Sequence, residues 1–575
     1  MKKLFLTISI FSILILLASC STSLLNNEDV VVEDTSSDLE NTVETIALPD
    51  IDEENMTVDL TQIDDTITFS NESITSTNDL VSIDDTTVTL TTNGTYTLTG
   101  TSLQATIYID ASSEDVITLI LNNVDLSSST GPIIYIENAD KVILHIKENT
   151  TNTLTDLSSS EYDKDAMIYS KDDLTINGLG TLTIDAGLQK GIKVNDDFIV
   201  YQTTLNIESE GHAIKVNNSI ILEDITLNIS SKSDGIQSDN DEDITKSLIY
   251  LVSGTYNITS FGDAISSAYD MTIYDGTYTL TSGYLNTNTD DTSAKSIKAD
   301  HNIYLIDGIY NITSSEDAIH SDDGLIIFDG QYTIDASDDA IHADQSLVIQ
   351  DGTFDIIESY EAIEAKYIDI NGGTFNIVAL DDAINASDPD ISSEAADVPN
   401  GGTASSSTST AVLTITDGTF YITADDDAID ANGTLTISGG TFYINGPTSG
   451  MQSLLDYDIE FILTGGTFVG VAGYGNETKY PSTDSTQVSI TYNTESIQQS
   501  GSTIALLDDQ NEVLLSFTTS RVYQVIFLTS SDLEEGSTYT LTINGVVEDT
   551  FTLDEITNTF NVSSSSMTPG LPPKR

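Results

Sequence analysis

The sequence predicts an all-β protein, a parallel β-helix with about 22 residues and three strands per coil, followed by a small antiparallel β domain. Glycine-aromatic elements such as GTYNI (from residue 254) and GTFYI (from 440) mark one strand of each coil. No helical crossover fits between such short strands, and a propeller needs repeats of about 40 residues. An isoleucine, usually after Asp-Ala, recurs at intervals of 22, 22, 29, 32, 22, 22, 22, 21 and 45 residues, at Ile192, Ile214, Ile236, Ile265, Ile297, Ile319, Ile341, Ile363, Ile384 and Ile429.

The chain begins with a segment typical of export. Two lysines precede an apolar run, and the segment closes with LASC at Cys20, the only cysteine of the chain. This arrangement looks like a bacterial lipobox, so we expect a signal peptide over residues 1–19 and a lipid on the Cys20 thiol. An ordinary signal peptide with an incidental cysteine is the alternative. The expected location is the extracellular face of the cell membrane, with the lipid as anchor and no disulfide in the mature protein.

Four further segments follow in order. Residues 20–62 are acidic, polar and aperiodic, which predicts a flexible tether. The repeats occupy residues 63–480 and are interrupted by insertions near 239–247, 283–296 and 386–410. Residues 485–560 predict an antiparallel β domain that caps the open end of the helix, because an exposed end coil is a free edge. Residues 561–575 are expected to be a flexible tail.

The charge of the chain excludes one class of partner. It carries 92 Asp and Glu against 18 Lys and Arg, a formal net charge of −74. Nucleic acid is excluded because phosphate binding depends on Lys and Arg. Hydrophobic residues make up 39% of the sequence, enough for a large core. No segment after the leader is long and apolar enough to span a membrane, and we expect a monomer.

Carboxylates cluster around each of the recurring isoleucines, called here the landmark isoleucines. Coils stack about 4.8 Å apart, so carboxylates on adjacent coils repel, and a cation between them reverses the sign. Calcium suits such a site because it accepts about 6–8 oxygen ligands. Solvated turn residues are the alternative, because Asp is common in turns. The candidate calcium ligands are Asp234, Asp239, Asp263, Asp317, Asp322, Asp339, Asp344, Glu361, Glu364 and Asp382.

His320 and His342 should stack on neighbouring coils. A soft-metal site is one interpretation, but the surrounding groups are oxygen-rich and no cysteine is near. The sequence therefore favours a hydrogen-bonded surface pair.

Aromatic residues form a second set of columns. The aromatic residue of each glycine element lies two residues before an Ile or Leu, so both should point into the core as a stack. Tyr421 and Tyr443 have the opposite parity and should point outward, as a platform for a sugar ring. In the preceding strand, Tyr274, Tyr304, Ile306, Ile326 and Phe328 should also point out, and we count Tyr274, Tyr304 and Phe328 as candidate carbohydrate-binding residues. Burial of this patch under the 283–296 insertion is the alternative.

Several blocks of the sequence resemble a known family. DVITLILNNVDLSSSTGPIIYIENADKVILHIKENTTNTLTD, AMIYSKDDLTINGLGTLTID and SDGIQSDN are similar, in this order, to bacterial carbohydrate-binding domain-containing proteins. The resemblance covers about residues 63–480 and implies a right-handed parallel β-helix related in fold to pectate lyases. It also implies binding of calcium, of acidic, pectin-like polysaccharide and of cellulose. The family usually has Asp-Gly-Ile where this chain has Asp-Ala-Ile after residue 263.

The basic residues favour binding over catalysis. A pectate lyase of this fold needs a basic residue to take the α-proton, often Arg, and the only arginines are Arg521 and Arg575. Four lysines lie on or near the repeated Asp-Ala-Ile elements: Lys193, Lys215, Lys298 and Lys366. The surrounding acids should raise the pKa of a lysine there, which does not suit a general base. We therefore expect a non-catalytic, calcium-bearing polysaccharide-binding lipoprotein. A calcium-dependent pectate lyase and a structural or adhesin surface protein remain the alternatives.

Overall fold

The computed structural model describes residues 49, 57–240, 242–283, 293–388, 410–448, 452–473 and 479–561. Every described residue belongs to one compact unit, Ala47–Arg575. The predicted signal peptide, Cys20, most of the tether, the tail beyond residue 561 and most of the 283–296 and 386–410 insertions lie outside the described residues. Within the described residues, no helix has the length and apolar character that a membrane crossing requires.

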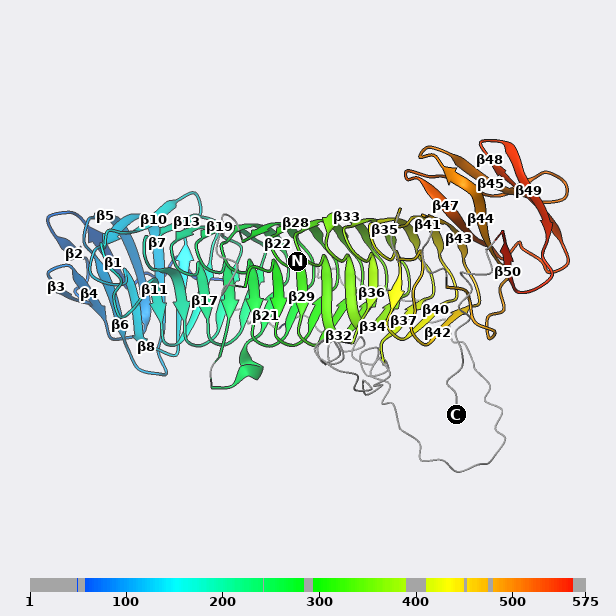
Figure 1. Cartoon of the computed structure of the whole chain (residues 1–575). Coiled ribbons are helices and arrows are strands. Elements are labelled where there is room, and N and C mark those ends of the chain that lie inside the picture. Colours follow the sequence, from blue (N-terminus) through cyan, green and yellow to red (C-terminus); the bar gives the residue numbers. More distant parts are fainter. Residues whose placement is uncertain are drawn as a thin grey trace, which may run out of the picture. The chain divides into compact units, whose positions relative to one another are not determined.

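The all-β prediction is confirmed. Nearly all described strands belong to one large, mainly parallel sheet, and the helical turn η2 (Ile244–Lys246) lies in the 239–247 insertion. Successive coils stack side by side along the solenoid (Figure 1). Each strand pairs with its equivalent on the next coil, so the solenoid has three ladders of strands, called here ladders I, II and III. Ladder I contains the landmark isoleucines, which pair in register, for example Ile319 with Ile341.

Ladder I starts where β3 (Ser82–Asp84) pairs antiparallel with β4 (Thr87–Leu90). It continues through β6 (Thr106–Asp110), β8 (Ile134–Asn138), β11 (Ala166–Ser170), β14 (Lys190–Val194), β17 (Ile214–Val216), β20 (Ile236–Ser238), β23 (Ile265–Ser267), β26 (Ile297–Ala299), β29 (Ile319–Ser321), the first halves of β32 (Ile341–Ile349) and β34 (Ile363–Ile370), β36 (Ile384–Ala386) and β39 (Asp430–Ala431).

Ladder II contains the strands that follow ladder I within each coil. It comprises the first half of β7 (Val116–Ser128), β9 (Lys141–Ile146), β12 (Asp173–Asn177), β15 (Phe198–Tyr201), β18 (Ile220–Glu223), β21 (Ile249–Leu251), β24 (Met271–Ile273), β27 (Ile303–Leu305), β30 (Gly324–Ile327), the second halves of β32 and β34, β37 (Val412–Ile415), β40 (Thr434–Ile437) and β42 (Glu460–Leu463).

Ladder III contains the strands of the glycine-aromatic elements. It comprises the second half of β7, β10 (Thr151–Asp156), β13 (Thr181–Asp185), β16 (Thr204–Ser209), β19 (Ile225–Ser231), β22 (Gly254–Thr259), β25 (Thr277–Ser282), β28 (Ile309–Ser314), β31 (Gln331–Ala336), β33 (Thr353–Ser359), β35 (Thr374–Ala379), β38 (Thr419–Ala424), β41 (Thr441–Asn445) and β43 (Thr467–Ala472). At the N-terminal end, β1 (Asp65–Phe69) pairs with β2 (Ile74–Ser76) and with β5 (Gly94–Ser102), which in turn pairs with β7.

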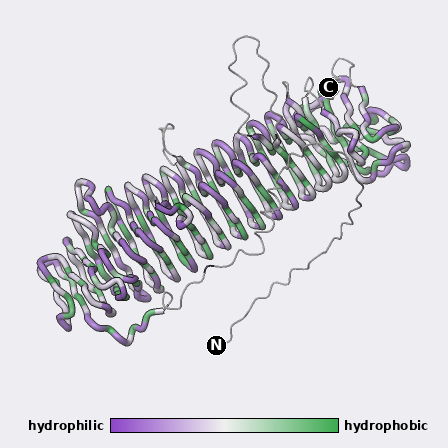
Figure 2. The backbone as a smooth tube through the Cα atoms, turned by 90° about the horizontal axis from the view of Figure 1, so that it is seen from below, coloured by the Kyte–Doolittle hydropathy of each residue, from purple (hydrophilic) through white to green (hydrophobic). Residues whose placement is uncertain are grey.

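The core lies inside the coils, as the alternation of apolar and polar residues requires. Hydrophobic and hydrophilic residues recur at equivalent places on successive coils (Figure 2). The predicted internal aromatic stack is confirmed, with neighbouring ring centroids 4.6 to 5.1 Å apart from Tyr256 to Phe468. The tyrosines of this stack donate a hydrogen bond to a turn carbonyl three residues earlier, as Tyr332 does to Asp329. This bond satisfies the hydroxyl that a buried tyrosine would otherwise leave unpaired.

The glycine before each stacked aromatic residue has a steric reason. Gly330 has a φ of 128°, and a Cβ atom there would lie 2.9 Å from Oη of Tyr332. Glycine therefore permits both the backbone turn and the approach of the ring. This explains why Gly-x-aromatic recurs as one unit in the sequence.

The C-terminal strands cover the last edge of ladder III. β47 (Tyr523–Thr529) pairs antiparallel with β43 and with β44 (Ser489–Gln498), which pairs with β50 (Thr557–Phe560). A separate antiparallel sheet has the order β46 (Val513–Thr518), β45 (Thr503–Leu507), β48 (Thr538–Ile543), β49 (Val546–Thr552). Arg521 ties these strands to the solenoid through an ion pair with Asp425 and a hydrogen bond to the Ala424 carbonyl.

One expectation about the outer surface of ladder II was wrong. Ile326 was expected to point outward as part of an exposed apolar patch, but it is buried, with 1% of its surface exposed, as is Val348 on the next coil at 4%. Strand parity gives the side of the sheet on which a residue lies, not whether other atoms cover it.

Candidate functional site

The outer side of ladder I, called here face I, carries most of the predicted metal ligands. Apolar residues of this ladder point inward, so polar residues two before, one after and three after each landmark isoleucine form outward columns. We call the column one after the isoleucine the central column, because register pairs its members coil by coil. From Lys193 onward it reads Lys193, Lys215, Gln237, Ser266, Lys298, His320, His342, Glu364, Asn385 and Asp430.

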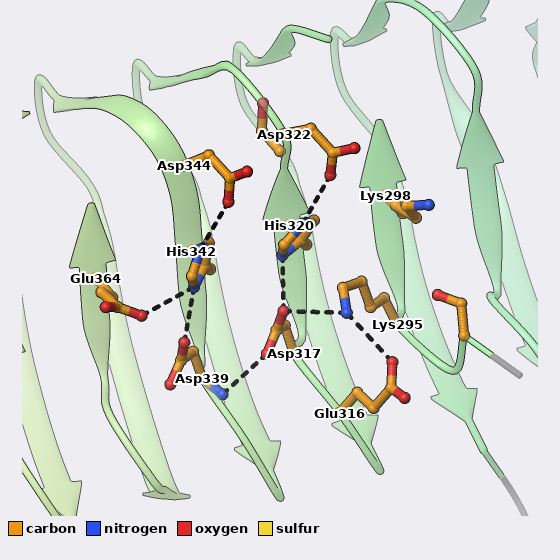
Figure 3. A network of polar contacts seen from close by, with 12 residues as sticks. Lys295, Lys298, Glu316, Asp317, His320, Asp322, Asp339, His342, Asp344 and Glu364 are labelled. Atoms are coloured by element: carbon orange, nitrogen blue, oxygen red, sulfur yellow. Dashed lines mark hydrogen bonds and ion pairs between the residues drawn. The ribbon is translucent and has the colours of Figure 1, made fainter. Parts of the chain in front are cut away.

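In the middle of face I, histidines hold the carboxylates (Figure 3). Nδ1 and Nε2 of His320 lie 2.7 and 2.8 Å from carboxylate oxygens of Asp317 and Asp322. A carboxylate accepts hydrogen bonds, so both ring nitrogens carry protons and the ring is an imidazolium. Burial opposes this charge, but the bonds to both carboxylates outweigh burial and raise the pKa of His320.

The next coil repeats the arrangement. His342 lies 2.8 Å from Asp339, 3.1 Å from Asp344 and 3.1 Å from Glu364, and these carboxylates raise its pKa against the effect of burial. The His320 and His342 rings stack at 4.8 Å. The two rings are hydrogen-bonded to carboxylates rather than to each other. The predicted histidine pair is therefore a pair of cations between acidic side chains.

These partners change the charge of the predicted calcium ligands. Burial would raise the pKa of Asp317, but the His320 hydrogen bond and the Lys295 charge lower it to about 2. Burial likewise opposes the charge of Glu364, yet His342 and Ser387 lower its pKa. In contrast, burial and the nearby charge of Asp317 raise the pKa of Asp339. The chain thus supplies its own cations to Asp317, Asp322, Asp339, Asp344 and Glu364.

We expect His320→Ala to lower the free energy of unfolding by about 3 kcal/mol, because it removes the imidazolium partner of a buried charge and leaves Lys295 as its remaining cation. Asp317, with 5% of its surface exposed, is that charge. Urea denaturation of the variant measures the loss. The double variant Asp317→Asn/His320→Ala should recover part of the stability, and a double variant less stable than the single one would contradict the pairing.

Towards the N-terminal side, face I has a hollow. Ser266 and Ala268 are small, and a cleft of about 350 Å³ opens between Asp234, Asp239, Asp263 and Asp300, with Lys298 at its edge. Burial and the charge of Asp234 raise the pKa of Asp263 to about 6. Nε2 of Gln237 donates to Asp234, whereas its Oε1 is buried without a hydrogen-bond partner among the described residues. The structure therefore brings Asp234, Asp239 and Asp263 together around an unsatisfied amide oxygen.

A second cluster lies towards the C-terminal end of face I and contains Glu361, Asp382, Asp427 and Asp430. Burial and the charges of Asp430 and Asp427 raise the pKa of Asp382 to about 8. Burial is also the main cause that raises the pKa of Asp427 to about 7, of Asp430 to about 6, and of Glu361. Unlike the middle of the face, this cluster contains no histidine in its described part, and the charge of Lys479, which acts on Asp427 and Asp430, does not outweigh burial and the neighbouring acids.

Asn385 lies within this cluster. Its Nδ2 donates to both carboxylate oxygens of Glu361 at 3.2 and 3.1 Å, and register places it between Glu364 and Asp430. Its Oδ1 is buried without a hydrogen-bond partner among the described residues, in a side chain that is 8% exposed. Leaving such an acceptor unpaired costs about 1–3 kcal/mol.

Both clusters fit a calcium ion by their chemistry. Each joins several carboxylates to an orphaned amide oxygen, and these are the hard oxygen ligands that calcium takes. Asp234, Asp239, Asp263 and Gln237 would hold one ion, and Glu361, Asp382, Asp427, Asp430 and Asn385 would hold another. Gln237 and Asn385 were missed from the sequence, although their position directly after the landmark isoleucine would have marked them.

The predicted sugar platform lies on the outer side of ladder III. The rings of Tyr421 and Tyr443 stack at 5.3 Å with an interplanar angle of 14°, and Tyr421 is 47% exposed. A groove of about 300 Å³ runs over them, with Ile357 and Val378 on its floor and Asp355, Asn376 and Asn445 as polar groups. Phe517 of β46 forms one wall, 5.7 Å from Tyr443 between ring centroids. Sequence reasoning missed Phe517, because it belongs to the C-terminal strands.

The other three predicted sugar-binding residues lie elsewhere. Tyr274, Tyr304 and Phe328 are half-buried at or next to strands of ladder II, and not in the groove of ladder III. Burial raises the pKa of Tyr274 and of Tyr304 to about 12. The structure therefore does not bring the five predicted aromatic residues into one site.

Comparison with known proteins supports the family suggested by the sequence. A family model described as carbohydrate-binding domain-containing protein matches residues 84–323 and 315–450. The chain belongs to this family of carbohydrate-binding domain-containing proteins.

A carbohydrate-binding domain-containing protein of Acetivibrio thermocellus is 31% identical over 150 residues, which is 25% of this chain and 52% of that protein. The chain thus spans about half the length of the curated relative it matches. A solved structure, the polysaccharide lyase-like protein from C. thermocellum in its gadolinium derivative, has 24% identity and a TM-score of 0.35, over 44% of this chain and 94% of that chain.

The residues matched to the family contain both carboxylate clusters of face I together with Tyr421 and Tyr443. Phe517 lies beyond the matched residues. In this carbohydrate-binding domain-containing protein, one wall of the aromatic groove therefore comes from outside the family region.

Proposed function

We propose that this protein binds polysaccharide without cleaving it, at a cell surface, through calcium held on face I and sugar stacking in the groove of ladder III. The observation that carries the proposal is the buried Oδ1 of Asn385, which has no hydrogen-bond partner among the described residues and lies in a cluster of carboxylates with raised pKa values. A bound calcium ion would accept the amide oxygen and replace the protons of those carboxylates.

Calcium would also leave coordination positions for the ligand. Protein carboxylates and acidic sugars repel, and a shared divalent ion reverses this repulsion. The glycan class that fits is therefore a uronate-containing, pectin-like chain, and a cellulose-like chain suits the tyrosine platform in the groove. Sugar rings present apolar C–H faces, which pack on aromatic rings such as Tyr421. The residues of the chain thus provide one charged contact surface and one stacking surface.

Three lysines of face I support binding without catalysis. Lys215, Lys298 and Lys366 form ion pairs with Asp239, Asp300 and Asp388 at 3.3, 2.9 and 3.2 Å. Burial opposes the charge of Lys298, but Asp300 outweighs burial and raises its pKa, which keeps the amine protonated. A protonated amine cannot act as a general base. Release of unsaturated oligouronides from polygalacturonate would contradict this part of the proposal.

Export and anchoring belong to the same proposal. A lipid on the Cys20 thiol would hold the protein at the extracellular face of the membrane, and the acidic residues 20–62 would separate the solenoid from the surface. Metabolic labelling with a fatty acid, compared between the native chain and Cys20→Ala, measures this anchor. Equal labelling of both would contradict it.

A pull-down on immobilised polygalacturonate tests the proposed binding. Calcium should raise retention about tenfold over chelator, since one additional charged contact is worth about 1.4 kcal/mol or more. Asp382→Asn/Asp430→Asn should lower this gain. Equal retention in calcium and chelator would contradict calcium bridging, and no retention in either condition would favour a structural or adhesin role.

The groove is tested separately on cellulose. Tyr421→Ala should lower retention by about fivefold, because loss of a stacking contact costs about 1 kcal/mol. Tyr360→Ala is a matched control, since Tyr360 is also 47% exposed but does not line the groove. Equal losses for both variants would contradict a role of the groove.

A further inference from the structure

The N-terminal part of face I differs in chemistry from the rest. Register extends the central column from Lys193 back to Tyr169, Tyr135 and Tyr108. The column thus begins with three tyrosines, continues with Lys193 and Lys215, and ends in acids. Nine of the 18 Lys and Arg residues of this acidic chain lie between residues 141 and 246. Aromatic and basic groups therefore meet on one surface, which we call the tyrosine–lysine strip (Tyr108, Tyr135, Lys164, Tyr169, Lys193).

The tyrosine rings of the strip are in contact and partly accessible. Ring centroids of Tyr108 and Tyr135 are 5.4 Å apart, and those of Tyr135 and Tyr169 are 5.7 Å apart in an edge-to-face arrangement. Tyr108 and Tyr135 are half-buried, whereas Tyr169 is buried beneath the lysines. The outer faces of Tyr108 and Tyr135 thus offer an aromatic surface about two coils long.

Two lysines of the strip keep their charge available. Nζ of Lys164 lies 5.7 Å from the Tyr135 ring centroid and 5.0 Å from that of Tyr169, and Nζ of Lys193 lies 5.6 Å from that of Tyr169. Cation–π contacts at these distances position an ammonium group. Among the described residues, neither ammonium has a carboxylate within ion-pair distance, unlike Lys171, Lys190 and Lys215, which pair with Glu137, Asp165 and Asp239.

Glu137, on whose pKa the charge of Lys164 acts, is already engaged. One oxygen of Glu137 pairs with Lys171, and the other accepts the hydroxyl hydrogen of Tyr135. Both of its oxygens are therefore used, and Lys171 balances its charge. Burial and the charges of Asp110 and Glu137 raise the pKa of Tyr108. The strip thus combines two half-exposed rings with two ammonium groups that have no carboxylate partner in the described part of the chain.

We propose that the tyrosine–lysine strip is a second glycan-binding site, which binds an acidic sugar directly and without calcium. The sugar ring would pack on Tyr108 and Tyr135, and its acidic group would pair with the ammonium groups of Lys164 and Lys193. Charge complementarity selects an anionic ligand here, in contrast to the carboxylate clusters, which repel anions unless a cation is present. The inference rests on the proposed polysaccharide binding but assigns it a separate site with the opposite charge.

Retention on polygalacturonate in excess chelator tests the strip, because chelator removes the calcium contribution. The native protein should keep measurable retention, and Lys164→Ala/Lys193→Ala should lower it about tenfold, since the variant loses two charge-assisted contacts that solvent screens. Lys164→Gln/Lys193→Gln keeps side-chain bulk over the rings and should give the same loss. Asp110→Asn should strengthen retention.

Controls separate this site from the calcium sites. Lys232→Ala removes a lysine of the same region that pairs with Glu210, and should leave retention in chelator unchanged within twofold. Asp382→Asn/Asp430→Asn should lower only the calcium-dependent part of the retention. A native protein that gains no retention from calcium but keeps the chelator-resistant part would contradict the calcium proposal alone. Retention in chelator that does not depend on Lys164 and Lys193, or no retention in chelator, would overturn the inference.

Two further polymers identify the acidic group. Fully methyl-esterified polygalacturonate keeps the sugar rings but lacks the carboxylate charge, so it should not be retained in chelator. Retention equal to that of the free acid would overturn the inference. Dextran sulfate carries sulfate in place of carboxylate. Stronger lysine-dependent retention on dextran sulfate would support the site and assign it to sulfated glycans, whereas stronger retention on polygalacturonate would assign it to uronates.

Discussion

Replacing Phe375 with alanine should lower the free energy of unfolding by about 3–5 kcal/mol, the largest effect that we expect from a single substitution. Phe375 is fully buried and stacks 4.7 Å from both Phe354 and Phe420 between ring centroids. Truncation removes two ring contacts at once and leaves a cavity, and strands paired on both sides limit relaxation. Urea denaturation followed by circular dichroism measures the loss.

The control for this prediction lies in the same strand. Val378 of β35 points outward and is 39% exposed, so Val378→Ala should change stability by less than about 0.5 kcal/mol. In a solenoid each coil contacts only its neighbours, so Phe375→Ala should also make unfolding less cooperative, with a lower denaturant slope. Equal losses for both variants would contradict the internal aromatic stack as the main support of the coils.

Calcium should change how stability depends on pH. The folded state raises the pKa of Asp382 to about 8 and of Asp427 to about 7, above the values near 4 of an unfolded chain. Between these values the folded state binds more protons than the unfolded state, so stability in chelator is greatest near pH 4 and falls as the pH rises through 7 to 8. Each extra bound proton corresponds to about 1.4 kcal/mol per pH unit.

Calcium replaces these protons and should reduce the loss of stability as the pH rises. At a concentration of about 100 times the dissociation constant, one bound ion adds about 2.7 kcal/mol. The midpoint of thermal unfolding at pH 5, 7 and 9, in calcium and in chelator, measures both effects, and the gain from calcium should be larger at pH 9 than at pH 5. Asp382→Asn/Asp430→Asn should flatten the dependence in chelator.

The histidines of face I should leave a separate contribution to this profile. The pKa of both His320 and His342 is raised, so their contribution is fully present below about pH 6.5 and is lost as the pH rises through their folded values. Calcium should not remove this part. A calcium gain that is equal at all three pH values, or that persists in Asp382→Asn/Asp430→Asn, would contradict the cluster around Asn385 as the calcium site.

Repetition made much of the fold predictable. The intervals between Ile319, Ile341 and Ile363 show which residues repeat, and alternation shows which of them point inward. The same reasoning correctly placed the aromatic stack inside and Tyr421 and Tyr443 outside. It did not predict the burial of Ile326, because alternation says nothing about what covers an outward side chain.

Local periodicity is enough to predict the all-β class, the repeat and the columns of polar residues. Which columns compensate one another's charge depends on contacts that appear only when the coils are stacked. The tertiary structure placed His320 between Asp317 and Asp322 as an imidazolium, left Oδ1 of Asn385 without a hydrogen-bond partner in the described part of the chain, and brought Phe517 to Tyr443 across 74 residues of sequence. Side-chain direction, burial and contacts between distant strands set these pairings, and the spacing of residues carries none of this information.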